Sequence, residues 1–302
     1  MSVVLEALGE RHSLDGAPWL MGIVNATPDS FSDGGLRPTL ELRLELARGL
    51  AAGGARVIDV GGESGVTHRP AVAPAEEIER VVPLIERIAA ELDVLVSVDT
   101  YKPAVAVAAI AAGAAIVNDV SGLRDPELAS VCARTGAALV VMHTAAPPKQ
   151  RLHDPDHYAD ILGEVIEFLA GRLELARSLG VAQEQLIVDP GPDFTKTPAQ
   201  TIELLRGGAR LHELGRPVLM AFSRKDFVGA LTGRIPSERG AGTLAALSHG
   251  LDLGGQIFRL HDIAAAADFI AVRAALRGDT EVARDLRLPD TLRWETPNEQ
   301  VQ

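Results

Sequence analysis

The chain has very little cysteine and few aromatic side chains. Its 302 residues include one cysteine, Cys132, and aromatic residues make up 4% of the sequence. A single cysteine in an alanine- and valine-rich context excludes a disulfide framework and a thiolate metal cluster, and it fits a reducing compartment. We expect Cys132 to be a small buried side chain. The hydrophobic fraction of 47% predicts a globular protein with a large, mainly aliphatic core.

Basic charge is also scarce, and no long apolar segment is present. The sequence has 29 Lys and Arg residues against 41 Asp and Glu residues, a net charge of −12. This balance argues against nucleic acid or an anionic membrane as the main partner, since either requires a basic face. The longest uncharged stretch, residues 103–118, is shorter than the ~20 residues that span a bilayer. Residues 1–12 lack the apolar stretch of a secretory signal, so we expect a soluble, cytoplasmic protein.

Eight short apolar runs recur along the chain and alternate with helical patterns. The runs are continuous and β-branched, which is typical of strands buried on both faces of a parallel sheet. They cover residues 20–24, 56–60, 94–98, 115–117, 138–142, 186–188, 217–222 and 256–260. The helical patterns cover residues 39–52, 74–89, 103–112, 126–134, 162–176, 197–214, 240–251 and 263–276.

Eight strands that alternate with helices predict an α/β protein, a (β/α)8 TIM barrel. A doubly wound open sheet with extra strands is the alternative. Such barrels use ~250 residues in a single domain, so we expect one domain. We place an N-terminal extension at residues 1–16, the barrel at residues 17–279 and a short polar tail at residues 280–302, which is too highly charged to enter the core.

Polar residues follow the apolar runs at the point where each run ends. They are Asn25, Gly61-Gly62-Glu63, Asp99, Asn118-Asp119, His143, Asp189, Ser223-Arg224-Lys225 and His261-Asp262, with Arg259 just inside the last run. In a barrel of this type the carboxyl ends of the strands converge on one mouth, where active sites lie. Each residue taken alone could simply cap the next helix, as we expect of Asp262. Together they indicate a site, because unpaired polar groups there would be costly.

The residue types suggest the chemistry of the ligand. Two carboxylates and an amide, from Asp99, Asp189 and Asn118, can hydrogen-bond the edge of a planar heterocycle with amidine-like N–H groups. The later loops supply Arg224, Lys225, Arg259 and His261. Loops after the seventh and eighth strands of such barrels often hold phosphate, so we expect a cationic corner beside the heterocycle.

These blocks resemble the signatures of the dihydropteroate synthase family. The run Met21-Gly22-Ile23-Val24-Asn25-Ala26-Thr27-Pro28-Asp29-Ser30-Phe31-Ser32-Asp33-Gly34-Gly35 is similar to its first signature, and Ile58-Asp59-Val60-Gly61-Gly62-Glu63-Ser64 to its second. Further matches, in order, extend the resemblance over residues 20–275. It implies that dihydropterin hydroxymethyl pyrophosphate condenses with 4-aminobenzoate, giving dihydropteroate and pyrophosphate for folate synthesis. It also implies Mg²⁺, two mobile loops after the first two strands, and a homodimer.

The resemblance assigns roles to residues at matching positions. It implies catalytic roles for Lys225, Arg259, His261 and Asp99, and a metal contact for Asn25. It implies substrate contacts from Asn25, Thr67, Arg69, Asp99, Asn118, Met142, Asp189, Phe194, Ser223, Arg224, Lys225, Asp226 and Arg259.

Four departures from the family pattern gather on the aminobenzoate side. Residues 65–68 lengthen the second loop before Arg69, Asp226 stands where the family has serine, residues 192–196 replace a turn rich in glycine and aromatics, and Ala221 replaces a glycine. A carboxylate at position 226 would repel the carboxylate of the substrate unless it turned outward or paired with Lys225, Arg224 or His68. The alternative to a synthase is therefore a pterin-binding paralogue with an altered second substrate or no turnover. A pterin-dependent methyltransferase would have no use for the cationic corner.

Overall fold

The computed structural model describes residues 3–27, 39–65 and 70–293. In these segments eight parallel strands form one sheet in the order β8-β7-β6-β5-β4-β3-β10-β9. A parallel bridge between Val188 and Val218 joins the two outer strands of this order and closes the sheet into a barrel. The strands are β3 (Trp19–Asn25), β4 (Val57–Gly61), β5 (Leu95–Asp99), β6 (Ile116–Asp119), β7 (Ala138–Met142), β8 (Leu186–Asp189), β9 (Leu219–Met220) and β10 (Ile257–Leu260).

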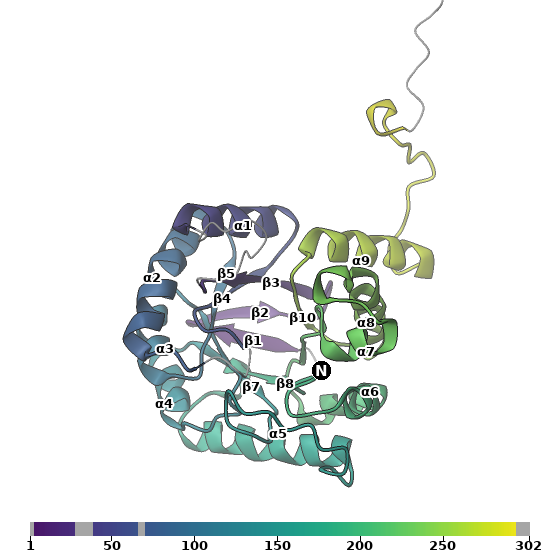
Figure 1. The fold of residues 1–302 in the computed structure, drawn as a ribbon. Coiled ribbons are helices and arrows are strands. Elements are labelled where there is room, and N and C mark those ends of the chain that lie inside the picture. The colour runs from purple at the N-terminus through teal and green to yellow at the C-terminus, as the bar shows by residue number, and fades with distance from the viewer. Residues whose placement is uncertain (1–2, 28–38, 66–69, 294–302) are drawn as a thin grey trace, which may run out of the picture.

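Helices surround this barrel, as Figure 1 shows. They are α1 (Leu40–Ala52), α2 (Pro74–Glu91), α3 (Pro103–Ala111), α4 (Glu127–Thr135), α5 (Ile161–Ser178), α6 (Pro198–Arg206), α7 (Asp226–Thr232), α8 (Gly240–Asp252) and α9 (Ile263–Arg277). The predicted TIM barrel is confirmed, and the closing bridge between β8 and β9 excludes the open sheet. No helix of the described residues is long and apolar enough to cross a membrane.

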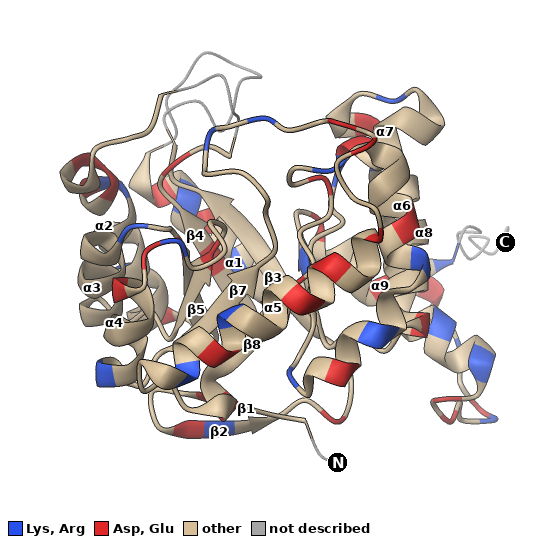
Figure 2. Ribbon diagram, turned by 90° about the horizontal axis from the view of Figure 1, so that it is seen from below, with Lys and Arg blue, Asp and Glu red and all other residues tan. Residues whose placement is uncertain are grey.

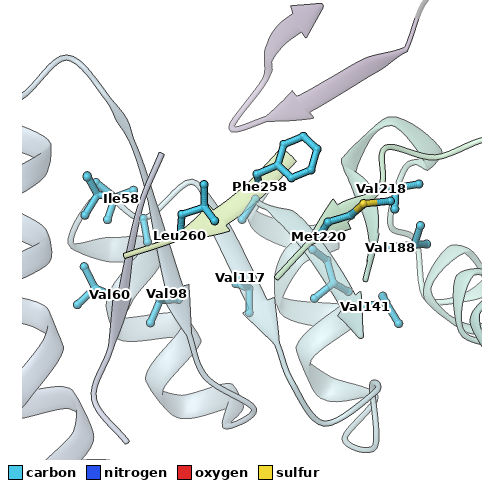
Figure 3. Close-up of a cluster of buried hydrophobic side chains, with 14 of the residues drawn as sticks. Ile58, Val60, Val98, Val117, Val141, Val188, Val218, Met220, Phe258 and Leu260 are labelled. Atoms are coloured by element: carbon cyan, nitrogen blue, oxygen red, sulfur yellow. The ribbon is translucent and has the colours of Figure 1, made fainter. Parts of the chain in front are cut away.

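The strands bury both faces, and their two-residue period separates two cores. On β4, Ile58 and Val60 point outward and join the layer between strands and helices, while Val57 points inward. Figure 3 shows the outward layer, including Val98, Val117 and Val141 from the next strands. The charged residues lie mostly on the outer helices and loops (Figure 2). Asp59 is two residues from Val57 on the same strand, so its side chain also points into the barrel.

Within the barrel, the structure differs from the predicted elements in three places. Strand β9 has only two residues, Leu219 and Met220, where the sequence predicted residues 217–222. Helix α7 was not predicted, because its seven residues are too few to show a helical period. The helix predicted over residues 197–214 consists of α6 followed by a separate 3-10 helix, η2 (Gly208–Leu214), since Gly207 and Gly208 interrupt it.

The predicted N-terminal extension contains a β-hairpin at one end of the barrel. Strands β1 (Val4–Ala7) and β2 (Glu10–Ser13) pair antiparallel, and Leu5 and Ala7 pack into the inward core. The guanidinium of Arg216 donates to the carbonyls of Val4 and Leu186, at 3.0 Å each, and so ties the hairpin to the barrel. Residues 279–293 are exposed, in keeping with a polar tail. Cys132 is buried and unpaired, as predicted.

Candidate active site

A pocket opens at the carboxyl ends of the strands. Its volume is about 530 Å³. Every strand of the barrel contributes a side chain from its end or from the loop that follows, namely Asn25, Glu63, Asp99, Asn118, Met142, Asp189, Lys225 and Arg259. The long loop between β7 and α5 adds a wall at residues 147–153. The arrangement follows from parallel strands, because all carboxyl ends meet at the same edge.

The structure brings most of the predicted site residues together in this pocket. Those that line it are Asn25, Asp99, Asn118, Met142, Asp189, Phe194, Arg224, Lys225, Asp226, Arg259 and His261. Ser223 lies one step behind: its hydroxyl is 2.8 Å from Nδ1 of His261 and accepts from the backbone N–H of His261 at 3.1 Å. Thr67 and Arg69, and His68 beside them, lie outside the described residues.

Arg259 lies between two carboxylates at the centre of the pocket. Its Nε donates to Oδ2 of Asp59 at 2.6 Å, and its Nη2 donates to Oδ2 of Asp99 at 2.7 Å. Asp59 also accepts from Nδ2 of Asn118 at 3.2 Å. Burial acts to lower the pKa of Arg259, but Asp59 and Asp99 outweigh it and raise that pKa. The guanidinium is therefore a permanent cation with a fixed orientation.

The pocket carboxylates hold protons more readily than exposed ones. Burial raises the pKa of Asp99 to about 7, because Arg259 offsets only part of the cost of burying the carboxylate. Burial also raises the pKa of Asp189, although Asp189 accepts from the N–H of Gly191 at 2.7 Å. A carboxyl group that holds its proton can donate as well as accept a hydrogen bond, which suits recognition of a heterocycle edge.

The loop that carries Arg224 and Lys225 is held in an unusual backbone conformation. Arg224 has a φ of 58°, which is sterically costly for a residue with a side chain. Its N–H donates to Oγ1 of Thr243 at 3.1 Å. Arg239 donates through Nη1 to the carbonyls of Arg224 and Lys225, at 2.8 and 3.1 Å. These contacts hold the backbone of the loop, while the side chains of Arg224 and Lys225 line the pocket.

Lys225 and His261 complete the cationic corner with different charges. Nζ of Lys225 lies 4.2 Å from the ring centroid of Phe194, within reach of a cation–π interaction. Burial lowers the pKa of His261 to about 4, with help from Arg224, Arg259 and Lys225. The pocket is therefore lined by the basic side chains of Arg224, Lys225 and Arg259 and by the neutral imidazole of His261. The sequence had suggested a cationic corner of all four residues.

Asp226 lines the pocket but is mostly exposed and paired with an arginine. Its side chain is 63% exposed, and Oδ1 accepts from Nη1 of Arg239 at 3.0 Å. The sequence suggested that Asp226 could turn outward or pair with Lys225, Arg224 or His68. The ion pair with Arg239, thirteen residues along the chain, was not foreseen. It reduces the repulsion that Asp226 would exert on an anionic substrate.

Glu63 fixes the base of the second loop. It accepts from the N–H of Val72 at 2.7 Å, and so brings together the two described ends of the loop around residues 66–69. It also accepts from Nζ of Lys102 at 2.6 Å and from the hydroxyl of Tyr101 at 2.9 Å. Lys149, from the loop between β7 and α5, pairs with the same carboxylate at 3.3 Å. The second loop is thereby anchored to two neighbouring loops.

A buried lysine supports the loop between β8 and α6. Nζ of Lys196 lies 2.9 Å from the carbonyl of Gly191, 3.0 Å from the carbonyl of Phe194 and 2.8 Å from Nδ1 of His143. Three acceptors match the three protons of an ammonium group. Burial lowers the pKa of Lys196 to about 7, although Asp189 acts in the opposite sense. Burial and the nearby Lys196 lower the pKa of His143 to about 2, so its imidazole stays neutral.

Sequence reasoning missed several residues that shape the site. Asp59 lies in the second signature but was given no role. A charged residue inside a strand that is otherwise apolar and buried could have indicated a site residue. Lys196 and Arg239 act through contacts between segments far apart in the chain, which no local pattern reveals.

The described residues contain no group of three His, Cys, Asp or Glu side chains that could hold a metal by themselves. At Gly61, however, the amide oxygen of Asn25 and the carboxylate of Asp99 approach from two sides. A Cβ at Gly61 would lie 3.7 Å from Oδ1 of Asn25 and 3.9 Å from Oδ2 of Asp99. Oδ2 of Asp99 already accepts from Arg259, so the amide oxygen of Asn25 is the donor that fits a hard cation held mainly by a phosphate ligand.

Comparisons with known proteins agree with this geometry. The family model for pterin binding enzymes matches residues 21–261. The dihydropteroate synthase of Synechocystis is 41% identical over 260 residues, which cover 85% of this chain and 90% of that protein. A structure of Xanthomonas albilineans dihydropteroate synthase with 4-aminobenzoic acid aligns with a TM-score of 0.84 at 42% identity, over 92% of this chain and 99% of the other.

A second structure from Xanthomonas albilineans, in complex with 7,8-dihydropteroate, aligns with a TM-score of 0.81 at 41% identity, over 91% of this chain and 98% of the other. The similarity thus extends over the whole barrel and includes the strands whose ends form the pocket. The chain belongs to the family of pterin-binding enzymes, among the dihydropteroate synthases.

Proposed function

We propose that the chain condenses dihydropterin hydroxymethyl pyrophosphate with 4-aminobenzoate to give dihydropteroate and pyrophosphate. The observation that carries this proposal is the arrangement of Arg259 between the buried carboxylate of Asp59 and the pocket carboxylate of Asp99, on the same pocket as Lys225 and Arg224. It places hydrogen-bonding groups for a heterocycle next to fixed positive charge. The similarity to proteins whose structures hold 4-aminobenzoic acid and 7,8-dihydropteroate supports the same two substrates here.

In this proposal the pterin lies in the inner part of the pocket. Asp99, Asn118 and Asp189 hydrogen-bond the pterin edge. The raised pKa values of Asp99 and Asp189 favour their protonated forms, which can donate as well as accept hydrogen bonds. Met142 and the plane of the Arg259 guanidinium pack against the ring. Asp59 holds Arg259 from beneath, because its carboxylate is fully buried and bonds Nε directly.

The leaving pyrophosphate faces the cationic corner. When the C–O bond breaks, both electrons leave with pyrophosphate, and the exposed methylene carbon becomes a cation stabilised by the pterin. Arg224, Lys225 and Arg259 are already oriented, so they stabilise the growing negative charge without reorganising in the reaction step. The amine nitrogen of 4-aminobenzoate then bonds to the methylene carbon and loses a proton. His261 offers a neutral donor to the phosphate oxygens, and Ser223 behind it orients the imidazole.

A magnesium ion fits this scheme as a companion of the pyrophosphate. Mg²⁺ is commonly bound by one or two protein oxygens together with substrate phosphates and water. Asn25 would supply a protein oxygen from the end of β3. When bound, the ion would neutralise charge on the leaving group.

The alternative, a pterin-binding paralogue without synthase turnover, rested mainly on Asp226. The ion pair between Asp226 and Arg239 weakens that case. The test is to mix the chain with dihydropterin pyrophosphate, 4-aminobenzoate and Mg²⁺ and to measure pyrophosphate release and dihydropteroate. We expect release that depends on the amine. Lys225→Ala should lower kcat about 100-fold at an unchanged melting temperature. Absence of dihydropteroate from the wild-type reaction would contradict the proposal.

We further propose a cytoplasmic homodimer. The buried, unpaired thiol of Cys132 fits a reducing compartment. Apolar side chains are exposed on α7, on α9 and just after α7, which Figure 1 shows on one side of the barrel; they are Leu231, Ile235, Val272 and Leu276. Light scattering should give twice the chain mass of 31.9 kDa. A monomer at micromolar concentration would contradict the dimer.

A further inference from the structure

The loop between β8 and α6 departs from ordinary backbone geometry at two residues. Asp193 has a φ of 64° and Thr195 a φ of 53°, and neither residue is glycine. Left-handed backbone of this kind costs about 1 kcal/mol or more per residue and persists where other contacts hold it. The loop also contributes Asp193, Phe194 and Thr195 to the pocket wall. Its conformation is therefore maintained beside the site, in the segment where the sequence departs from the family pattern.

The Asp193 carboxylate connects this loop to the helices on either side of it, α6 and α7. Oδ1 accepts from the hydroxyl of Thr201 on α6 at 3.0 Å, and the same hydroxyl accepts from the N–H of Asp193 at 3.0 Å. Oδ2 accepts from the N–H of Phe227 in the first turn of α7, at 3.2 Å. We call these three hydrogen bonds the Asp193 bridge. They join α6, the loop and α7 through one side chain.

The Asp193 bridge connects the two segments that place Phe194 and Lys225. Phe194 follows Asp193 directly, and Lys225 precedes α7, so the bridge fixes the spacing at which Nζ of Lys225 lies 4.2 Å from the Phe194 ring. Asp193 also acts on the charge of Lys225. Burial lowers the pKa of Lys225, and Asp193, ahead of Asp189 and Asp226, offsets that effect, while Arg259 adds to it.

We propose that Asp193 is a positioning residue for the end of the site that takes the amine substrate: its carboxylate joins the β8–α6 loop to α7 and so sets Lys225 beside Phe194. The inference rests on the proposed function for the identity of that substrate. The contacts and charges that carry it are properties of the chain itself. Lys196 holds the same loop through backbone carbonyls, so the loop keeps a second anchor when Asp193 is changed.

The charge part of the proposal can be tested without substrate. Acetic anhydride acetylates only neutral amines, so the rate of Lys225 acetylation against pH, followed by mass spectrometry, gives the apparent pKa of Lys225. Because Asp193 favours the protonated form, Asp193→Asn should lower that pKa by about one unit and speed acetylation about tenfold below it. Asp226→Asn is the matched control. It removes a carboxylate that is mostly exposed and paired with Arg239, so the shift should stay below about 0.3 units.

The geometric part is tested by kinetics with two further variants. Asp193→Gly suits a φ of 64° without strain, so a folding defect is not expected from the backbone. It should raise KM for 4-aminobenzoate about tenfold and KM for the pterin substrate much less. Thr201→Val removes the hydroxyl of the bridge but keeps the carboxylate. It should raise KM for 4-aminobenzoate about threefold and leave the pKa of Lys225 unchanged.

The outcomes separate this inference from the proposed function. An unchanged Lys225 acetylation profile in Asp193→Asn would overturn the charge role, whether or not the chain makes dihydropteroate. Equal rises of both KM values in Asp193→Gly would overturn the positioning role. Failure of the wild type to form dihydropteroate contradicts the proposed function alone, because the acetylation experiment still decides the role of Asp193.

Discussion

Asp59 offers the sharpest test of how the site is held together. It is fully buried, its Oδ2 bonds Arg259 and Asn118, and its Oδ1 has no hydrogen-bond partner among the described residues. Asp59→Asn keeps the shape of the side chain and removes the charge. A charge-assisted hydrogen bond contributes about 1.5–3 kcal/mol. Arg259 keeps its bond to Asp99, so the larger cost of an unpaired buried charge should not arise.

We therefore expect a loss of about 2 kcal/mol in transition-state stabilisation. That corresponds to a decrease of about 30-fold in kcat/KM for the pterin substrate. The free energy of unfolding should stay the same or rise, because a buried carboxylate with one unpartnered oxygen is costly to fold. The assay is steady-state kinetics at saturating 4-aminobenzoate, together with urea denaturation.

A matched control lies on the next strand but one. Asp119 is also fully buried, but its oxygens accept from Ser121 and from the N–H of Leu123 in a turn next to it. Asp119→Asn should lower stability by about 1–2 kcal/mol and leave kcat/KM within about twofold. The reasoning is refuted if Asp59→Asn behaves like Asp119→Asn, with lost stability and intact kcat/KM.

Three further predictions concern surface charge, acid stability and the second loop. Asp226→Ser should change KM for 4-aminobenzoate by less than about threefold, because an exposed ion pair with Arg239 contributes little; a tenfold decrease would restore the like-charge argument. The pKa of His143 is lowered on folding, so its contribution to stability is complete above pH ~6.5 and is lost as pH falls, by about 1 kcal/mol between pH 6.5 and 5.5. His143→Gln should flatten this part of the urea midpoint against pH, whereas the exposed His153→Gln should not; equal slopes in both variants would argue against it. Glu63→Gln should raise KM for 4-aminobenzoate and also lower the melting temperature, because the pKa of Glu63 is lowered on folding and its charge therefore stabilises the fold; unaltered kinetics would show that the anchor is dispensable.

The barrel could be predicted from the sequence because its strands are continuous apolar runs. What failed were elements whose local sequence carries too little pattern, some of them supported by distant contacts. The hairpin of β1 and β2 was missed because its two-residue turn consists of Leu8 and Gly9, both with positive φ, and leucine is rare at such a position. Helix α7 is short, and Arg239 supports its first turn from beyond its end.

The site was predictable to a similar extent and for similar reasons. Residues at strand ends converge by the geometry of the barrel, so Asp99, Asn118 and Asp189 could be placed at one mouth in advance. The partners that orient the site residues could not, since Asp59 and Arg259 are 200 positions apart in the chain. The role of Asp193 depends on its left-handed backbone conformation, which the sequence does not predict.

The central claim is that a pterin pyrophosphate binds at this mouth through Arg259 and the strand-end carboxylates. Isothermal titration calorimetry of the chain with dihydropterin pyrophosphate and Mg²⁺ tests it most directly. The account predicts saturable binding at one site per chain, weakened at least tenfold by Asp189→Ala and by Arg259→Ala in proteins that melt as cooperatively as the wild type. Heats that never saturate, or identical affinity in all three proteins, would contradict it.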